Sequence, residues 1–121
     1  MGDGLTVTVR REDGLAVITV IGEVDLSTVS QLRERLYELA DAGEPLIVDL
    51  EQVSFIDSTG LGALVGAYRR AAAHGGSLHA VCVQPQARKL LSLTGVDQRV
   101  PLSASLAEAL ASVAAARDTA G

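Results

Sequence analysis

Apolar and polar residues alternate near the start of the chain, with the period of two that is typical of half-buried β-strands. This pattern predicts one strand at residues 5–9 and a second, more apolar strand at residues 15–21. Asp13 and Gly14 separate them, and an Asp-Gly pair favours a tight turn. We therefore expect the two strands to form an antiparallel hairpin.

From residue 29 the apolar residues recur every three or four positions, which is the spacing of an amphipathic helix. The apolar face consists of Val29, Leu32, Leu36 and Leu39. Ser27 precedes the repeat and is the expected N-cap, because its hydroxyl can accept a hydrogen bond from a free backbone N–H. Gly43 follows the repeat, where a residue in the left-handed conformation ends many helices.

Strand-and-helix units make up the rest of the chain. The predicted strands are residues 46–50, 78–83 and 100–102, and the predicted helices are residues 58–73, residues 86–93 and a last helix that opens at Ser105. Gly60, Gly62 and Gly66 lie in the first of these helices, where glycine weakens helix formation, so we expect close backbone packing there. Helical crossovers of this length join parallel strands. The order predicts an α/β fold with a mixed, mostly parallel sheet of about five strands and about four helices.

The composition is that of one folded domain spanning residues 1–121, since 48% of the residues are hydrophobic and 21% are charged. The net charge of −5 and the few aromatic residues argue against binding of nucleic acid, which requires basic or stacking surfaces. No apolar run approaches the roughly 18 residues of a membrane span. The single cysteine, Cys82, excludes metal sites built on cysteine pairs and suits a reducing compartment. We expect a cytoplasmic protein without a cofactor, a metal or a membrane contact.

Candidate chemistry lies where two predicted strands end, at residues 22–25 and 53–62. If the two strands are parallel neighbours, both segments lie at one edge of the sheet, which is where ligands collect in α/β folds. Asp57, Ser58 and Thr59 would then begin a helix, whose free N–H groups favour an anion. One interpretation of these residues is simple helix capping, since Asp, Ser and Thr are common N-caps.

A second interpretation is a small serine hydrolase in which Ser58 is the nucleophile. The hydrolase elbow has the sequence Gly-x-Ser-x-Gly, and Ile56 takes the place of its first glycine. His74 and His79 are the candidate bases, and both fall near the opposite edge of the predicted sheet. The sequence therefore disfavours this chemistry. A third interpretation is that Ser58 is itself the substrate of another enzyme.

A family resemblance bears on the third interpretation. Five segments of the chain are similar, in order, to the sequence signature of bacterial anti-sigma factor antagonists, which are single-domain members of the STAS superfamily. These segments are residues 22–25 (GEVD), 48–50 (VDL), 55–62 (FIDSTGLG), 75–78 (GGSL) and 93–96 (LTGV). The resemblance spans nearly the whole chain and implies a STAS-like fold.

The resemblance also implies a function. In that family the anti-sigma factor is a serine kinase that phosphorylates the serine after the aspartate, and a metal-dependent serine phosphatase removes the phosphate. By position the acceptor here is Ser58, so the chain would be a substrate and not an enzyme. The unphosphorylated form would bind the kinase and release a sigma factor for transcription, in a setting such as stress response, sporulation or development.

The residues expected at the partner-binding surface are Glu23, Asp25, Ser27, Asp57, Ser58, Thr59 and Gly60. A phosphate adds a charge of about −1.5 to −2, and we expect it to weaken a contact that is already acidic. The two aspartates could orient Ser58 for phosphoryl transfer or merely cap helices, and Thr59 is a second possible acceptor. The alternative within the superfamily is an interaction subunit of a transporter or sensory complex that is not phosphorylated.

Overall fold

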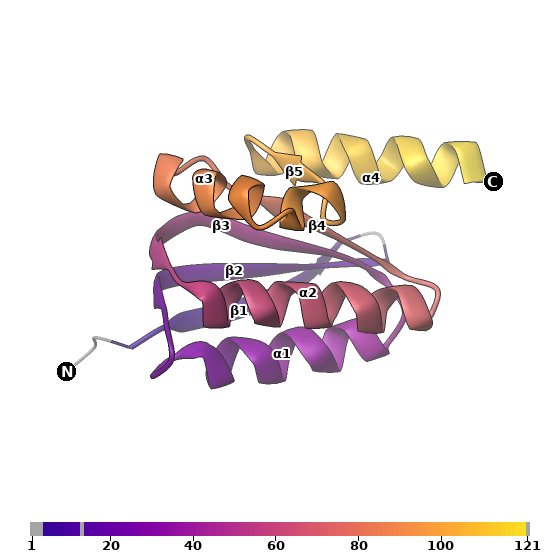
Figure 1. Ribbon diagram of the computed structural model, residues 1–121. Helices are drawn as coiled ribbons and strands as arrows, with labels where there is room; N and C mark the ends of the chain where they lie inside the picture. The colour runs from indigo at the N-terminus through magenta and orange to yellow at the C-terminus, as the bar shows by residue number, and fades with distance from the viewer. Residues whose placement is uncertain (1–3, 13, 121) are drawn as a thin grey trace.

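The computed structural model describes residues 4–12 and 14–120, which form a five-stranded sheet in the order β1-β2-β3-β4-β5 (Figure 1). The strands are β1 (Thr6–Glu12), β2 (Leu15–Val24), β3 (Pro45–Ile56), β4 (Ser77–Val81) and β5 (Leu102–Ser103). The first two strands pair antiparallel, as the hairpin pattern predicts, and all later pairs are parallel. The predicted α/β fold with a mixed, mostly parallel sheet is confirmed.

Helices cover the two faces of the sheet unequally (Figure 1). The helices are α1 (Val29–Asp41), α2 (Ser58–Ala73), α3 (Pro85–Leu93), the short 3₁₀ helix η1 (Val96–Gln98) and α4 (Leu106–Ala120). Each parallel strand is added on the same side of the previous one, so right-handed crossovers place α1, α2 and α3 on one face. The other face is left for α4.

The hydrophobic core follows the alternation of side chains along the central strands. Ile18 of β2 and Val48 of β3 are fully buried against the face that carries α1, α2 and α3. Val17 and Ile47, one residue earlier in each strand, are fully buried on the α4 face. Successive strand residues point to opposite faces, so both faces of these two strands are covered and their sequences are almost wholly apolar.

β2 and β3 are longer than the sequence analysis predicts. β2 continues to Val24 and β3 to Ile56, so residues 22–24 and 53–56 are strand and not loop. The two strands pair with each other in this outer part, in a register that includes Ile21↔Gln52 and Val24↔Ile56 and contains two irregularities. Backbone hydrogen bonds between the two strands therefore continue through these polar segments. The pattern of apolar residues does not reveal this extension.

The outer half of β3 has no neighbouring strand on its β4 side among the described residues. The pairing of β3 with β4 runs from Pro45 to Asp49 and ends there. Beyond it, the side-chain amide of Gln84 donates to the carbonyl oxygen of Glu51, and that of Gln86 donates to the carbonyl oxygen of Ile56 at 3.2 Å. Two glutamine side chains thus replace a strand where the sheet narrows.

The N-cap of α1 is Thr28, and the prediction of Ser27 was wrong. The Thr28 hydroxyl donates to the carbonyl oxygen of Glu23 at 2.8 Å and accepts from the backbone N–H of Asp25 at 3.0 Å. This hydroxyl therefore ties the helix start to the end of β2. The other end agrees with the sequence, since Gly43 has a φ of +77° just after the helix.

The glycines of α2 differ in their surroundings. A Cβ atom on Gly66 would overlap the hydroxyl oxygen of Tyr37, and one on Gly60 would lie 2.6 Å from Cγ1 of Ile56 in the core. Nothing lies within 4 Å of such an atom on Gly62, which is exposed. The expected close packing is confirmed at the first two positions and was wrong at Gly62.

Candidate functional site

The predicted site residues come together at the carboxyl edge of the sheet, where β2 and β3 end side by side. Val24 and Ile56 are register partners, so Asp25 and Asp57 occupy equivalent positions, each directly after its strand. The backbone N–H of Asp57 donates to the carbonyl oxygen of Val24 at 3.1 Å and extends the ladder by one bond. This geometry brings the two acidic turns to one surface.

Asp57 is the N-cap of α2. Its Oδ1 atom accepts hydrogen bonds from the backbone N–H groups of Thr59 at 2.9 Å and Gly60 at 3.3 Å. The Thr59 hydroxyl donates to the same oxygen at 2.5 Å. These bonds, led by the Thr59 hydroxyl, hold the pKa of Asp57 below its usual value, although burial and the charge of Asp25 act in the opposite direction. The capping interpretation is confirmed for this aspartate.

Asp25 forms a similar turn before α1. Its Oδ1 atom accepts from the hydroxyl of Ser27 at 2.7 Å and from the backbone N–H of Ser27 at 3.0 Å. The Ser27 hydroxyl is the largest cause of a lowered pKa for Asp25. Both carboxylates are therefore ionised at neutral pH. Glu23 is exposed next to them, so three acidic side chains gather at this edge.

Ser58 is the exposed first residue of α2, and its hydroxyl has no hydrogen-bond partner in the part of the chain that the structure describes. The neighbouring hydroxyl of Thr59 is half-buried and bonded to Asp57. Gly60 is buried and presents no side chain to a partner. Of the two hydroxyls that follow Asp57, only that of Ser58 is both accessible and unengaged.

Exposed apolar side chains surround the acidic residues, and the sequence analysis did not assign them to the site. Leu26 is 78% exposed in the turn between β2 and α1, and Phe55 is 41% exposed near the end of β3. Val83, which follows β4 at the same edge, is 44% exposed. These three side chains are therefore available for contact with another molecule. Leu26 could have been found in the sequence, because it stands alone among polar turn residues.

The two histidines lie away from Ser58. His74 caps the far end of α2, a helix of 16 residues and therefore about 24 Å long, and His79 lies near the start of β4. Neither can act as a base for Ser58, so the hydrolase geometry is absent. In residues 4–12 and 14–120, no group of three His, Cys, Asp or Glu side chains could hold a metal ion. Within those ranges, no helix has both the length and the apolar character needed to cross a bilayer.

Comparisons with known proteins identify relatives over most of the chain. The STAS domain family matches residues 6–109. The anti-sigma-B factor antagonist of Bacillus subtilis is 33% identical over 100 residues, which are 83% of this chain and 92% of the relative.

Solved structures agree with this match. An anti-sigma factor antagonist from Mycobacterium paratuberculosis has a TM-score of 0.85 at 32% identity, covering 93% of this chain and 97% of the other. The Bacillus cell fate determinant SpoIIAA, in its phosphorylated form, has a TM-score of 0.69 at 25% identity, covering 89% of this chain and 99% of that one.

Proposed function

This chain belongs to the STAS domain family, and on that premise we propose that it is an anti-sigma factor antagonist whose binding surface is switched by phosphorylation of Ser58. The unmodified chain binds an anti-sigma factor that is a serine kinase, and this frees a sigma factor for transcription. Phosphorylation of Ser58 ends the binding, and a serine phosphatase restores it. The switch operates in the cytoplasm.

The observation that carries this proposal is the state of the Ser58 hydroxyl. It is exposed and unengaged among the described residues, whereas the adjacent Thr59 hydroxyl is held by Asp57. A kinase can therefore reach Ser58 without breaking a hydrogen bond of the fold. Further support comes from a relative, since SpoIIAA has been solved in a phosphorylated form.

The composition of the surrounding surface explains how a phosphate would release a partner. Leu26 is almost fully exposed beside Asp25, and the charge of Asp25 acts on Asp57, so apolar and acidic groups share the surface. A phosphate in a contact of this kind meets like charges and must lose its hydration. A change of about 3 kcal/mol in the binding free energy would weaken the complex roughly a hundredfold.

The test is phosphorylation by a candidate anti-sigma kinase with Mg-ATP, followed by intact-mass spectrometry and peptide mapping. The wild-type chain should gain one phosphate, located on Ser58. Ser58→Ala should gain none and should still bind the kinase. Ser54→Ala is the matched control, because Ser54 is also exposed at this edge and its hydroxyl makes only a long contact of 3.4 Å to Gly22.

The outcomes separate the alternatives. Phosphorylation of Ser58→Ala to the wild-type extent would show that the acceptor is another residue, and mapping would then test Thr59 directly. A stable complex without any phosphate transfer would favour an interaction subunit that is not phosphorylated. Failure of both Ser58→Ala and Ser54→Ala to gain a phosphate would indicate a general effect of this edge of the sheet on kinase docking.

A further inference from the structure

The amino edge of the sheet, opposite the phosphorylation site, contains two cavities of about 260 Å³ each. They lie on either side of the start of β4 and share Gly76, Ser77 and His79 in their linings. We call the one lined by Val113 and Ala116 the α4-side cavity, and the one lined by Tyr68 and Ala72 the α2-side cavity. Their chemistry differs.

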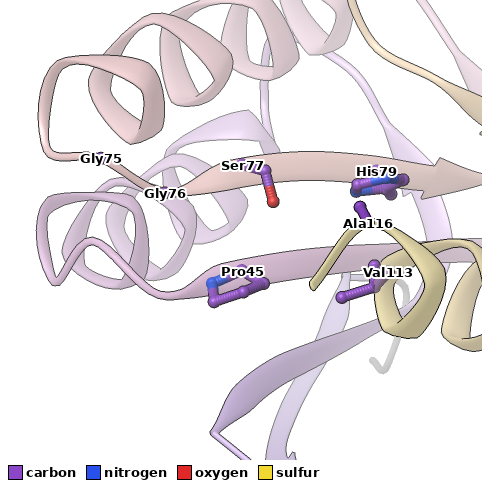
Figure 2. A pocket seen from close by; sticks show the side chains of 7 residues that line it. All are labelled: Pro45, Gly75, Gly76, Ser77, His79, Val113 and Ala116. Atoms are coloured by element: carbon purple, nitrogen blue, oxygen red, sulfur yellow. The ribbon is translucent and has the colours of Figure 1, made fainter. Parts of the chain in front are cut away.

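The α4-side cavity lies between the starts of β3 and β4 and the later turns of α4 (Figure 2). Pro45 and Val113 provide apolar walls, and the polar side chains are Ser77 and His79. The Nδ1 atom of His79 is buried without a hydrogen-bond partner among the described residues, and burial lowers the pKa of this imidazole. The imidazole is therefore neutral at pH 7, and the side chains described around this cavity offer no charge to a ligand.

The α2-side cavity, in contrast, has a cation on its wall. Arg99 is exposed, and its guanidinium forms neither an ion pair nor a hydrogen bond within residues 4–12 and 14–120. Tyr68 lines the same cavity, is half-buried, and its hydroxyl is likewise unengaged in those ranges. Most other arginines are occupied: Arg10, Arg11, Arg35 and Arg70 are in ion pairs, and Arg88 donates to the carbonyl oxygen of Cys82.

Besides the shared Ser77 and His79, which are uncharged, the remaining side chains of the α2-side cavity are apolar. Ala72 of α2, Leu78 of β4 and Pro101 before β5 supply them. An engineered cavity of about 150 Å³ is large enough to hold benzene, so about 260 Å³ accommodates one ring with a small substituent. The cavity thus combines a largely apolar volume of ring size with a donor of charge-assisted hydrogen bonds at its wall.

We propose that the α2-side cavity binds a small organic carboxylate with a flat apolar body. The planar guanidinium of Arg99 matches the two oxygens of a carboxylate, and the Tyr68 hydroxyl can donate a further hydrogen bond. The ring of the ligand lies against Ala72, Leu78 and Pro101. The net charge of −5 on the chain repels anions in general, so binding depends on this local cation.

Benzoate is a suitable probe, because it is the simplest ring that carries a carboxylate. In an amide NMR titration at constant ionic strength, we expect saturable shifts confined to the residues around the α2-side cavity. The expected Kd is of millimolar order, as befits a ligand of about nine non-hydrogen atoms. Benzamide, which has the same shape without the charge, should bind about tenfold more weakly.

Two variants and a matched control locate the site. Arg99→Gln should weaken benzoate binding about tenfold, because it removes the charge-assisted hydrogen bonds. Arg69→Gln removes the same charge from an exposed residue of α2 that does not line the cavity, and it should leave the Kd unchanged. Ala72→Leu should block binding by filling the cavity while it keeps the charge of Arg99.

The proposal fails if benzoate gives no saturable shifts at tens of millimolar, if benzamide binds equally well, or if Arg99→Gln and Arg69→Gln behave alike. An amide spectrum of each variant that matches the wild type elsewhere shows that the fold is intact. The inference does not rest on the phosphorylation switch. Ser58→Ala should bind benzoate with the wild-type Kd, because Ser58 lies at the other end of α2.

Discussion

Gly60 is packed so closely against Val24 that a Cβ atom on the glycine would lie 2.7 Å from the Cγ1 atom of the valine. The same atom would lie 2.6 Å from Cγ1 of Ile56, and both neighbours are fully buried β-branched residues that close the two central strands. The absence of a side chain at position 60 therefore lets the first turn of α2 rest directly on the ends of β2 and β3. This contact therefore holds the start of α2, and with it Ser58, close to the ends of the two strands.

We expect Gly60→Ala to destabilise the fold by about 1–3 kcal/mol, because stiff side chains on both sides must move to admit the methyl group. The measurement is the free energy of unfolding in urea. Gly62→Ala is the control, since its Cβ atom meets nothing within 4 Å. That change should stabilise the fold by about 0.5–1 kcal/mol through helix propensity. Equal changes in the free energy of unfolding for the two substitutions would contradict the close packing of Gly60 against Val24 and Ile56.

Asp57→Ala should lower the stability at pH 7 by about 1 kcal/mol, because the backbone N–H groups of Thr59 and Gly60 lose their acceptor. The folded-state pKa of Asp57 lies below its ordinary value. The contribution of the charged carboxylate is therefore complete above the unfolded-state pKa, at about pH 4, and is lost as the pH falls below it.

The check is a series of urea unfolding curves between neutral and strongly acidic pH. The stability difference between wild type and Asp57→Ala should shrink as the pH drops below about 4. Asp57→Asn keeps a capping oxygen without the charge, so its own contribution should not change over this range. A difference between wild type and Asp57→Ala that stays constant with pH would show that the charge has no part in the cap.

Leu26→Ala should weaken the complex with the anti-sigma kinase about tenfold while leaving the stability of the free chain within about 0.5 kcal/mol. Leu26 is 78% exposed in the turn between Asp25 and Ser27, so it contributes little to the core. Leu93 is exposed to a similar extent, 74%, at the end of α3, and Leu93→Ala is the matched control. Calorimetric titration of both variants measures the affinity. If both variants lose affinity equally, or if neither loses any, the turn that contains Leu26 is not part of the interface.

Ser58→Glu should imitate the phosphorylated state only in part. One carboxylate carries a charge of −1, whereas a phosphate carries about −1.5 to −2 and three acceptor oxygens. We expect an affinity for the kinase between those of the unmodified and phosphorylated chains. Ser112→Glu makes the same charge change at an exposed position of α4 and should have no effect on binding. Undiminished affinity of Ser58→Glu, measured by calorimetry, would count against electrostatic release.

The helix that carries Ser58 could be predicted from the sequence with its full bounds, residues 58–73. Its start is marked by the cap-forming Asp57 and its end by the glycines at 75 and 76, and these signals act through neighbours in the chain. The α/β class could also be predicted, since it depends on the order of strands and helices. Signals from residues close together in the sequence were sufficient for the bounds of this helix and for the fold class.

The outer parts of β2 and β3 could not be predicted, because their pairing joins residues about thirty positions apart and polar side chains such as Glu23 and Ser54 interrupt the apolar pattern. The N-cap of α1 depends on where β2 ends, which the apolar pattern also did not reveal. Ser27 and Thr28 are adjacent hydroxyl residues, and it is the Thr28 hydroxyl that bonds to the end of β2, through Glu23 and Asp25.

Some site residues could likewise be predicted from the sequence, and others could not. The sequence located Ser58 and the two acidic turns, which the register of β2 and β3 then brings to one edge. It did not show that Leu26 is exposed beside them, or that Arg99 faces a cavity with Tyr68. The lining of a cavity arises from how several elements pack, and no local pattern encodes it.

The narrowing of the sheet beyond Asp49, where Gln84 and Gln86 replace a strand, predicts a gradient of amide hydrogen exchange along β3. Amides of the inner half, which have strands on both sides, should exchange only through global unfolding, whereas those of residues 51–56 can exchange through local opening. Ser58 follows this part of β3 by two residues, so the helix start that carries it is attached to the part of the sheet that can open while the core stays intact.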